Sequence, residues 1–224
     1  MAQDLCTWQD VWSLTRRAVS GVYTQADIQT LCEGDTNTQG LIEVWSRWFE
    51  GQCGIVFDWT EDAVIYLDGK NTNQVFLPSA FVNPAVSALS YEVSGSLTEV
   101  TEYDVTDEGI IRLTGYAISD YSARSGMPRF SRGRGNVKVT LNYGYEAIPA
   151  DVRGAVARQI GLEVLGLYDD AVDQGVKSRR LGDRQESWGS GKFSGTIERW
   201  EDDIATTLRG YRGGVRVDPA VRTG

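Results

Sequence analysis

The clearest alternation of apolar and polar positions lies between residues 136 and 165. Four apolar residues occupy every second position of one short run, which predicts a half-buried strand: Val137, Val139, Leu141 and Tyr143. Gly144 interrupts this alternation. Beyond it, apolar residues recur every three or four positions, which predicts a helix with one apolar stripe: Val152, Val156, Ile160, Val164 and Leu167. A strand, a turn and a buried helix therefore follow one another.

The beginning of this helix is marked by Pro149 and Asp151. Proline has no N–H for strand pairing and suits the approach to a helix, and the helix dipole favours a carboxylate in the first turn. Three glycines lie inside the predicted helix, at Gly154, Gly161 and Gly166. Each weakens a helix by about 1 kcal/mol relative to alanine. We expect the close approach of another backbone to compensate for this cost.

Similar patterns divide the whole chain into regions of different character. The regions are an N-terminal helical region at 1–53, a β-rich region at 54–147, a core helix at 148–175, and a segment at 176–224 that holds a linker, a last helix and a C-terminal tail. Together they predict an α+β fold, in which the N-terminal helices and the long later helix form a small bundle. The tail from Arg212 onward has no core-forming pattern, and we expect it to become ordered only against a partner.

Helices are predicted in the N-terminal region by two apolar faces and one capping pair. The first face consists of Leu5, Trp8, Trp12 and Ala18 or Val19, and the second of Leu41, Val44, Trp45, Trp48 and Phe49. Thr24 and Asp27 have the spacing of a capping pair, and Gly51 and Gly54 are expected to end the second face. We interpret the four tryptophans as core or subunit-interface residues. The last helix is predicted from Phe193 to Tyr211 by apolar residues at Ile197, Trp200, Ile204 and Leu208.

Short strands are predicted throughout the β-rich region. They are Ile55 to Phe57, Ala63 to Leu67, Val75 to Leu77, Ala85 to Val93, Val100 to Val105, Gly109 to Leu113 and Val137 to Tyr143. A glycine-rich stretch at 124–134 interrupts them and reads as a mobile loop that carries Arg124, Arg129, Phe130, Arg132 and Arg134 without an acid. Three interpretations stay open for this loop: a solvated segment, a contact with an acidic face of a neighbouring subunit, or a contact with DNA phosphates and bases.

The composition excludes several kinds of chemistry. The chain has 224 residues and no histidine, which removes imidazole bases and the commonest zinc ligand. Its three cysteines are widely spaced and read as buried free thiols. The stretch Gly189 to Lys192 lacks the flanking residues of a phosphate loop, and the acidic clusters near residues 58–62 and 169–173 lack a calcium-loop pattern. We therefore predict no catalytic residue, no cofactor and no metal site.

Charge is divided unequally along the chain, whose net charge is −9. Residues 1–111 contain four Lys and Arg against 17 Asp and Glu, whereas residues 112–224 contain 18 against 14. Acidic and basic surfaces of stacked or ring-forming subunits can pair in such a chain, although scattered solvated charge is equally compatible with it. No run approaches the roughly 20 apolar residues of a membrane span, and the first residues do not have a signal peptide's pattern, so we expect no membrane partner and synthesis in a cytoplasm.

An ordered series of motifs resembles the head-tail connector (adaptor) family of tailed bacteriophages. The series consists of Tyr103-Asp104-Val105, then Gly109-Ile110-Ile111-Arg112-Leu113, then the run VKVTLNYGYEAIPADVRGAV at 137–156. Each motif is weak by itself, and their order carries the resemblance, which extends from about Thr24 to Tyr211. Tyr143 directly precedes Gly144 in this chain, whereas the spacer between the corresponding tyrosine and glycine is longer in many members of that family.

This resemblance implies a structural virion protein located in the neck between capsid and tail and made in the host bacterial cytoplasm. It implies binding to the portal ring, assembly with copies of itself as a dodecamer, attachment of a stopper or tail protein, and passage of double-stranded DNA through the ring. It also implies a C-terminal docking segment, for which we select Arg209, Tyr211, Arg212, Val215 and Val217. Two alternatives stay open: another neck protein, such as a stopper or tail terminator, or a β-rich protein that binds or cleaves carbohydrate, because the chain has seven tryptophans and ten tyrosines.

Overall fold

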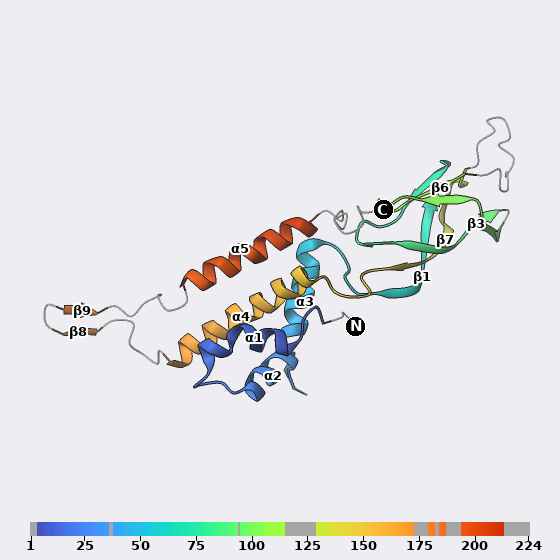
Figure 1. Cartoon of the computed structure of the whole chain (residues 1–224). Coiled ribbons are helices and arrows are strands. Elements are labelled where there is room, and N and C mark those ends of the chain that lie inside the picture. The colour runs from blue at the N-terminus through green and yellow to red at the C-terminus, as the bar shows by residue number, and fades with distance from the viewer. Residues whose placement is uncertain are drawn as a thin grey trace, which may run out of the picture. The chain divides into compact units, whose positions relative to one another are not determined.

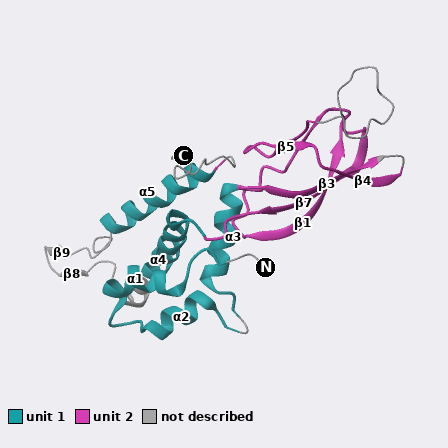
Figure 2. Ribbon diagram, turned by 45° about the vertical axis from the view of Figure 1, so that its right-hand side comes forward, with its two compact units in different colours: residues 1–53, 148–211 teal, residues 54–147, 212–224 magenta. Residues whose placement is uncertain are grey.

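The computed structural model divides the chain into two compact units (Figures 1 and 2). It describes residues 4–35, 38–93, 95–114, 129–172, 179–181, 184–186 and 194–212. Unit 1 comprises residues 1–53 and 148–211, and unit 2 comprises residues 54–147 and 212–224. Within these described residues, helices and one short pair of strands make up unit 1, and antiparallel sheets make up unit 2, which confirms the predicted α+β class.

Unit 1 is built around one long helix. Its helices are α1 (Trp8–Val19), α2 (Gln25–Glu33), α3 (Leu41–Cys53), α4 (Ala150–Val172) and α5 (Ser194–Tyr211). Because α4 packs against α1, α3 and α5, apolar residues on several of its sides are buried. The predicted stripe from Val152 to Val164 is confirmed, but Leu167 is 40% exposed, so the buried stripe ends one turn earlier than expected.

The glycine at the middle of α4 explains how three helices approach one another. A Cβ atom at Gly161 would lie 2.8 Å from Cζ3 of Trp200 in α5 and 3.5 Å from Cγ2 of Thr15 in α1. The expected close approach therefore exists at this glycine, but side chains make it and no backbone does. A Cβ at Gly166 would meet nothing within 4 Å, so that glycine has no packing role.

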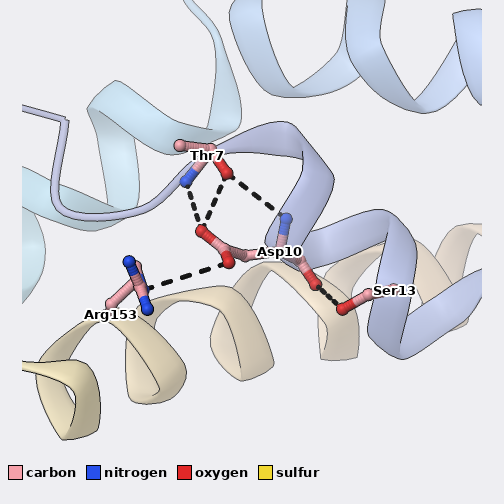
Figure 3. Close-up of polar contacts among 4 residues, drawn as sticks. All are labelled: Thr7, Asp10, Ser13 and Arg153. Carbon is pink, nitrogen blue, oxygen red and sulfur yellow. Dashed lines mark hydrogen bonds and ion pairs between the residues drawn. The ribbon is translucent and has the colours of Figure 1, made fainter.

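Two helices of unit 1 begin with the same capping box. The Thr7 side chain accepts the backbone N–H of Asp10, and the Asp10 carboxylate accepts the backbone N–H of Thr7 (Figure 3). Asp10 also lies 4.0 Å from Nε of Arg153, which links the beginning of α1 to α4. Thr24 and Asp27 repeat the box at α2, as predicted. Hydrogen bonds from Thr24 lower the pKa of the Asp27 carboxyl.

The buried faces of α1 and α3 differ from the predicted ones. In α1 the buried line is Val11, Thr15 and Val19, and in α3 it is Ile42, Ser46, Phe49 and Cys53. Trp8, Trp12 and Trp45 are only half-buried, and Trp48 is 36% exposed. Thr15 is buried beside Gly161 of α4, and Ser46 is buried where its hydroxyl accepts the backbone N–H of Leu5. Gly51 lies inside α3, and the helix ends just before Gly54, whose φ is +70°.

Unit 2 consists of two antiparallel sheets around one apolar core. Its strands are β1 (Thr60–Gly69), β2 (Gln74–Phe76), β3 (Ala85–Val93), β4 (Ser96–Val100), β5 (Tyr103–Val105), β6 (Ile110–Leu113) and β7 (Gly133–Tyr143). The sheet orders are β1-β7-β3-β4 and β2-β6-β5. Val139 of β7 lies opposite both Ile65 of β1 and Leu89 of β3, so β7 is the strand through which the larger sheet is joined. A further pair, β8 (Arg179–Leu181) and β9 (Arg184–Glu186), belongs to unit 1 and forms a two-stranded sheet of its own.

Three strand predictions need correction. Ile55 to Phe57 forms no strand, because only Val56 makes a single bridge, to Phe81. The predicted run from Val100 to Val105 is divided between β4 and β5, which belong to different sheets. β7 begins at Gly133, inside the stretch that was predicted to be a loop. Local patterns show neither where a strand changes sheets nor where a partner strand extends pairing.

The turn after β7 depends on glycine for two reasons. Gly144 has a φ of +100°, a conformation that glycine adopts without a steric cost. A Cβ atom there would also lie 2.1 Å from the carbonyl oxygen of Asp58. The Gly144 N–H donates to the carbonyl of Val82 at 2.9 Å, which fixes the turn against the neighbouring loop. The strand ends here because both the conformation and the space require it.

Gly161→Ala and Gly166→Ala test the packing around α4. Both substitutions improve helix propensity by a similar amount, about 1 kcal/mol. The difference between the two variants in the free energy of unfolding therefore isolates the contact with Trp200. We expect Gly161→Ala to be less stable than Gly166→Ala by about 1–3 kcal/mol, the usual cost of overpacking. Urea denaturation of the two variants measures this difference, and equal stabilities would contradict the contact.

Thr7→Ala tests the capping box at α1. Loss of the side-chain acceptor should reduce the free energy of unfolding by about 1 kcal/mol, because the backbone N–H of Asp10 loses the Thr7 hydroxyl as its acceptor. Ser13→Ala is a matched control, since Ser13 is exposed and only donates to the carbonyl of Asp10 within the same helix. Thermal denaturation should show a lower melting temperature for Thr7→Ala than for the natural chain and a nearly unchanged one for Ser13→Ala. If Ser13→Ala lowers the melting temperature as much as Thr7→Ala does, the cap has no special role in stability.

Candidate assembly surfaces

The stretch from Arg129 to Gly135, here called the arginine turn, is anchored in the core of unit 2. Phe130 is fully buried and its ring lies edge-on to Tyr91 with centroids 5.9 Å apart. Its backbone N–H donates to the carbonyl of Thr72 at 2.8 Å. The expectation that Phe130 stands between the arginines as an exposed contact residue is therefore wrong. Its aromatic ring fixes the turn and cannot stack on a base.

Asn136 holds the arginine turn to the end of β1. Its side-chain oxygen accepts the N–H of Gly69 at 2.8 Å, and its amide nitrogen donates to the carbonyl of Ser131, also at 2.8 Å. Only 5% of Asn136 is exposed, so these groups have little access to water. A Cβ atom at Gly69 would lie 2.0 Å from the Ser131 oxygen, which shows how closely the two segments pack. The described part of the turn is thus a fixed structure, not the mobile loop expected from its composition.

This fixed turn presents cations to solvent. Arg129, Arg132 and Arg134 are exposed, and Lys70 is exposed beside them because Gly69 pairs with Gly133. None of these four cations forms an ion pair with a described residue. The nearby carboxylate of Asp68 accepts the N–H of Gly135 at 2.7 Å. Arg124, also predicted to belong to this surface, lies outside the described residues.

The end of α5 contains the second group of predicted contact residues. Tyr211 is 4% exposed, and its hydroxyl donates to Asp151 Oδ1 at 3.0 Å. Its predicted role as a partner contact is therefore corrected: the side chain fastens α5 to the first turn of α4. Arg209 and Arg212 are exposed, whereas Val215 and Val217 lie outside the described residues. The guanidinium of Arg209 donates to the carbonyl of Ala205 within its own helix.

Several large apolar side chains are exposed; Trp48 was interpreted from the sequence as a core or subunit-interface residue, and the others were not singled out as contacts. On α3 they are Val44 and Trp48, and on the strands they are Val64, Tyr66, Phe76 and Leu97, which are 48–62% exposed. Trp45 is held differently, because its indole N–H donates to the Glu163 carboxylate. In the sequence, Val64 and Tyr66 alternate with other apolar residues of β1, so periodicity gives no signal that they face outward.

The cysteines lack the properties of reactive thiols. Cys6, Cys32 and Cys53 are free and buried, as expected. Burial raises the pKa of the Cys32 thiol to about 12 and also raises that of Cys6, so both stay protonated near neutral pH. Within the described residues, no group of three His, Cys, Asp or Glu side chains is placed to hold a metal ion.

No family model matches the chain, and no curated protein matches it. In the part of the chain that the structure describes, no helix is long and apolar enough to cross a membrane.

Asn136→Ala tests whether this residue fixes the arginine turn. The substitution leaves the Gly69 N–H and the Ser131 carbonyl without their partner, and we expect a loss of about 2–3 kcal/mol in the free energy of unfolding. Amide exchange at Phe130 should also become faster. Thr140→Ala, on the same strand, should cost less than about 1 kcal/mol and leave that exchange unchanged. Native-like exchange in Asn136→Ala would contradict the anchoring.

Proposed function

We propose that the chain is a structural protein that works by binding copies of itself and other proteins. The main support is the arrangement of the chain around Gly144, where a core strand, β7, leads through an obligatory glycine turn into the central helix, α4. This connection ties together two units with different structures. Exposed cations and apolar side chains on both units supply contact surfaces, and in this proposal the protein catalyses no reaction.

Within this class, we propose a head-tail connector of a tailed bacteriophage. The motifs that resemble the connector family fall on consecutive elements: Tyr103 to Val105 is β5, Ile110 to Leu113 is β6, and the long run covers most of β7, the Gly144 turn and the beginning of α4. Residues with clear structural duties, such as Gly144, Pro149 and Asp151, are the ones that define the series. The resemblance therefore rests on positions that this fold needs.

The proposed mechanism is mechanical. Each subunit buries surface against two neighbours and against the portal ring, and twelve subunits form a ring that continues the channel for double-stranded DNA. The C-terminal tail folds when it docks on the portal, and the opposite side of the ring accepts a stopper or tail protein. The protein works in the neck of the virion after synthesis in the host bacterial cytoplasm.

Deletion of residues 212–224 tests the portal contact. Since α5 ends at Tyr211, whose hydroxyl is bonded to Asp151, the deletion should leave unit 1 folded. We expect the truncated chain to lose binding to portal particles of the virus that encodes it, measured by cosedimentation. Circular dichroism and thermal denaturation should stay close to those of the full chain.

A full-length chain whose residues 212–224 are replaced by glycine and serine is the matched control for length. It should fail to bind in the same way, because the contact depends on side chains of the tail. If both altered chains bind portal particles as the natural chain does, docking by the tail is wrong.

A further inference from the structure

The two ends of unit 2 carry opposite charge. β1 and β7 run antiparallel, so the pair Gly69 and Gly133 marks one end and the pair Thr60 and Tyr143 marks the other. The first, here called the basic end, carries the exposed cations Lys70, Arg129, Arg132 and Arg134, which outnumber the two exposed acids beside them, Asp68 and Glu92. Figure 2 shows β1, β7 and β3 lying side by side through this unit. The strands thus separate two surfaces that can be compared.

The second surface, here called the acidic end, gathers carboxylates from three segments. They are Asp58, Glu61, Asp62, Asp107, Glu108 and Glu146, of which all but the half-buried Asp58 are exposed. The segments are brought together by backbone hydrogen bonds: Gly109 accepts the N–H of Leu77, and Ala80 accepts the N–H of Val56. The described ranges at this end, 54–62, 78–86, 105–110 and 141–147, contain no lysine or arginine. Nothing within these ranges neutralises the six acids.

The distance between the ends lets each act independently. The ten residues of β1 span about 30 Å at the usual rise of a strand. Screening at physiological salt acts over about 8 Å, so the cations of one end hardly compensate the acids of the other. Unit 2 therefore behaves as a body with two separate, oppositely charged faces.

We infer that copies of this chain associate head to tail, with the basic end of one unit 2 against the acidic end of another. Contacts between two basic ends or between two acidic ends are repelled, so the interface is heterologous, and such an interface closes into a ring when its rotation allows. The anchoring of the arginine turn by Phe130 and Asn136 lowers the ordering cost of this contact.

A second copy fits the basic end better than DNA does. The chain has a net charge of −9 and a pI near 4.6, which disfavours the approach of a polyanion, while every further copy brings an acidic end. The burial of Phe130 also removes the aromatic platform that single-stranded DNA would need. The inference rests on the proposed function in that copies of the chain are its neighbours in a ring, but it is testable without a portal.

Two charge-reversed, full-length variants test the interface. The first carries Arg129→Glu, Arg132→Glu and Arg134→Glu, so that both ends of unit 2 are acidic. The second carries Glu61→Lys, Asp107→Lys, Glu108→Lys and Glu146→Lys, which leaves Asp58 and Asp62 against four lysines, so that both ends are basic. A control with Arg16→Glu, Arg17→Glu and Arg199→Glu makes the same net change as the first variant on exposed residues of unit 1. Circular dichroism and thermal denaturation establish that all three are folded.

Sedimentation velocity at about 50 mM and 500 mM salt measures self-association. We expect the natural chain and the control to associate at low salt and to weaken at least about tenfold at high salt. Each reversed variant alone should associate at least about tenfold more weakly than the natural chain, because its two ends repel. An equimolar mixture of the two variants should recover association, since acidic ends then meet basic ends.

Failure of the mixture to associate, or association of either variant alone at the natural strength, would overturn the inference. Absence of association by the natural chain and by the mixture at low salt would do the same. If the first variant loses affinity for a duplex DNA probe while its self-association is unchanged, the basic end binds DNA and the inference is wrong. Portal binding is measured in parallel: variants that bind portal particles but show none of the expected pairing refute this interface and leave the proposed function standing.

Discussion

The structure depends on one constraint at the point where a strand becomes a helix. Gly144 must adopt a left-handed conformation, and a Cβ atom there would lie within 2.1 Å of the Asp58 carbonyl oxygen. On one side of it stands β7, the strand that pairs with both β1 and β3. On the other side stands α4, which packs against α1, α3 and α5. The strand that pairs with β1 and β3 and the helix that packs against three others are therefore joined through a position that only glycine can occupy.

Each unit uses its own means to fix a surface. In unit 1, Gly161 makes room for Trp200 and Thr15, and the capping box at Thr7 ties the beginning of α1 to α4 through Arg153. In unit 2, the buried ring of Phe130 and the side chain of Asn136 hold the arginine turn. Buried groups thus position exposed charges, and rigid charged surfaces suit a protein whose work is to meet partners in a defined orientation.

Sequence patterns predicted those elements whose residues repeat with a clear period. β7, the stripe of α4 and the apolar line of α5 were all visible, because in each the buried apolar residues recur at the period of the element. The capping pair at Thr24 was recognised, and the same spacing at Thr7 was overlooked. The four-residue spacing of Val11, Thr15 and Val19 was hidden by the tryptophans nearby, since hydrophobicity alone ranks an indole above a threonine.

The features that could not be predicted from the sequence depend on contacts between segments that are distant in the chain. Phe130 stands in an arginine- and glycine-rich stretch that resembles a loop, and only its packing on Tyr91 reveals a core residue. Tyr211 lies near the end of the chain, where a side chain is expected to be accessible, and only the hydrogen bond from its hydroxyl to Asp151 reveals its structural role. The two charged ends of unit 2 combine residues far apart in the chain, so their opposition appears only once the strand register is known.

The most direct measurement of the central claim is the position of this chain in a virus particle. Cryo-electron microscopy of purified virions, with an antibody fragment bound to the chain, locates it among the other components. A structural connector predicts a ring of labels at one vertex, between the portal and the tail. Labels spread over the capsid, confined to the tail tip, or absent from intact particles would contradict the account.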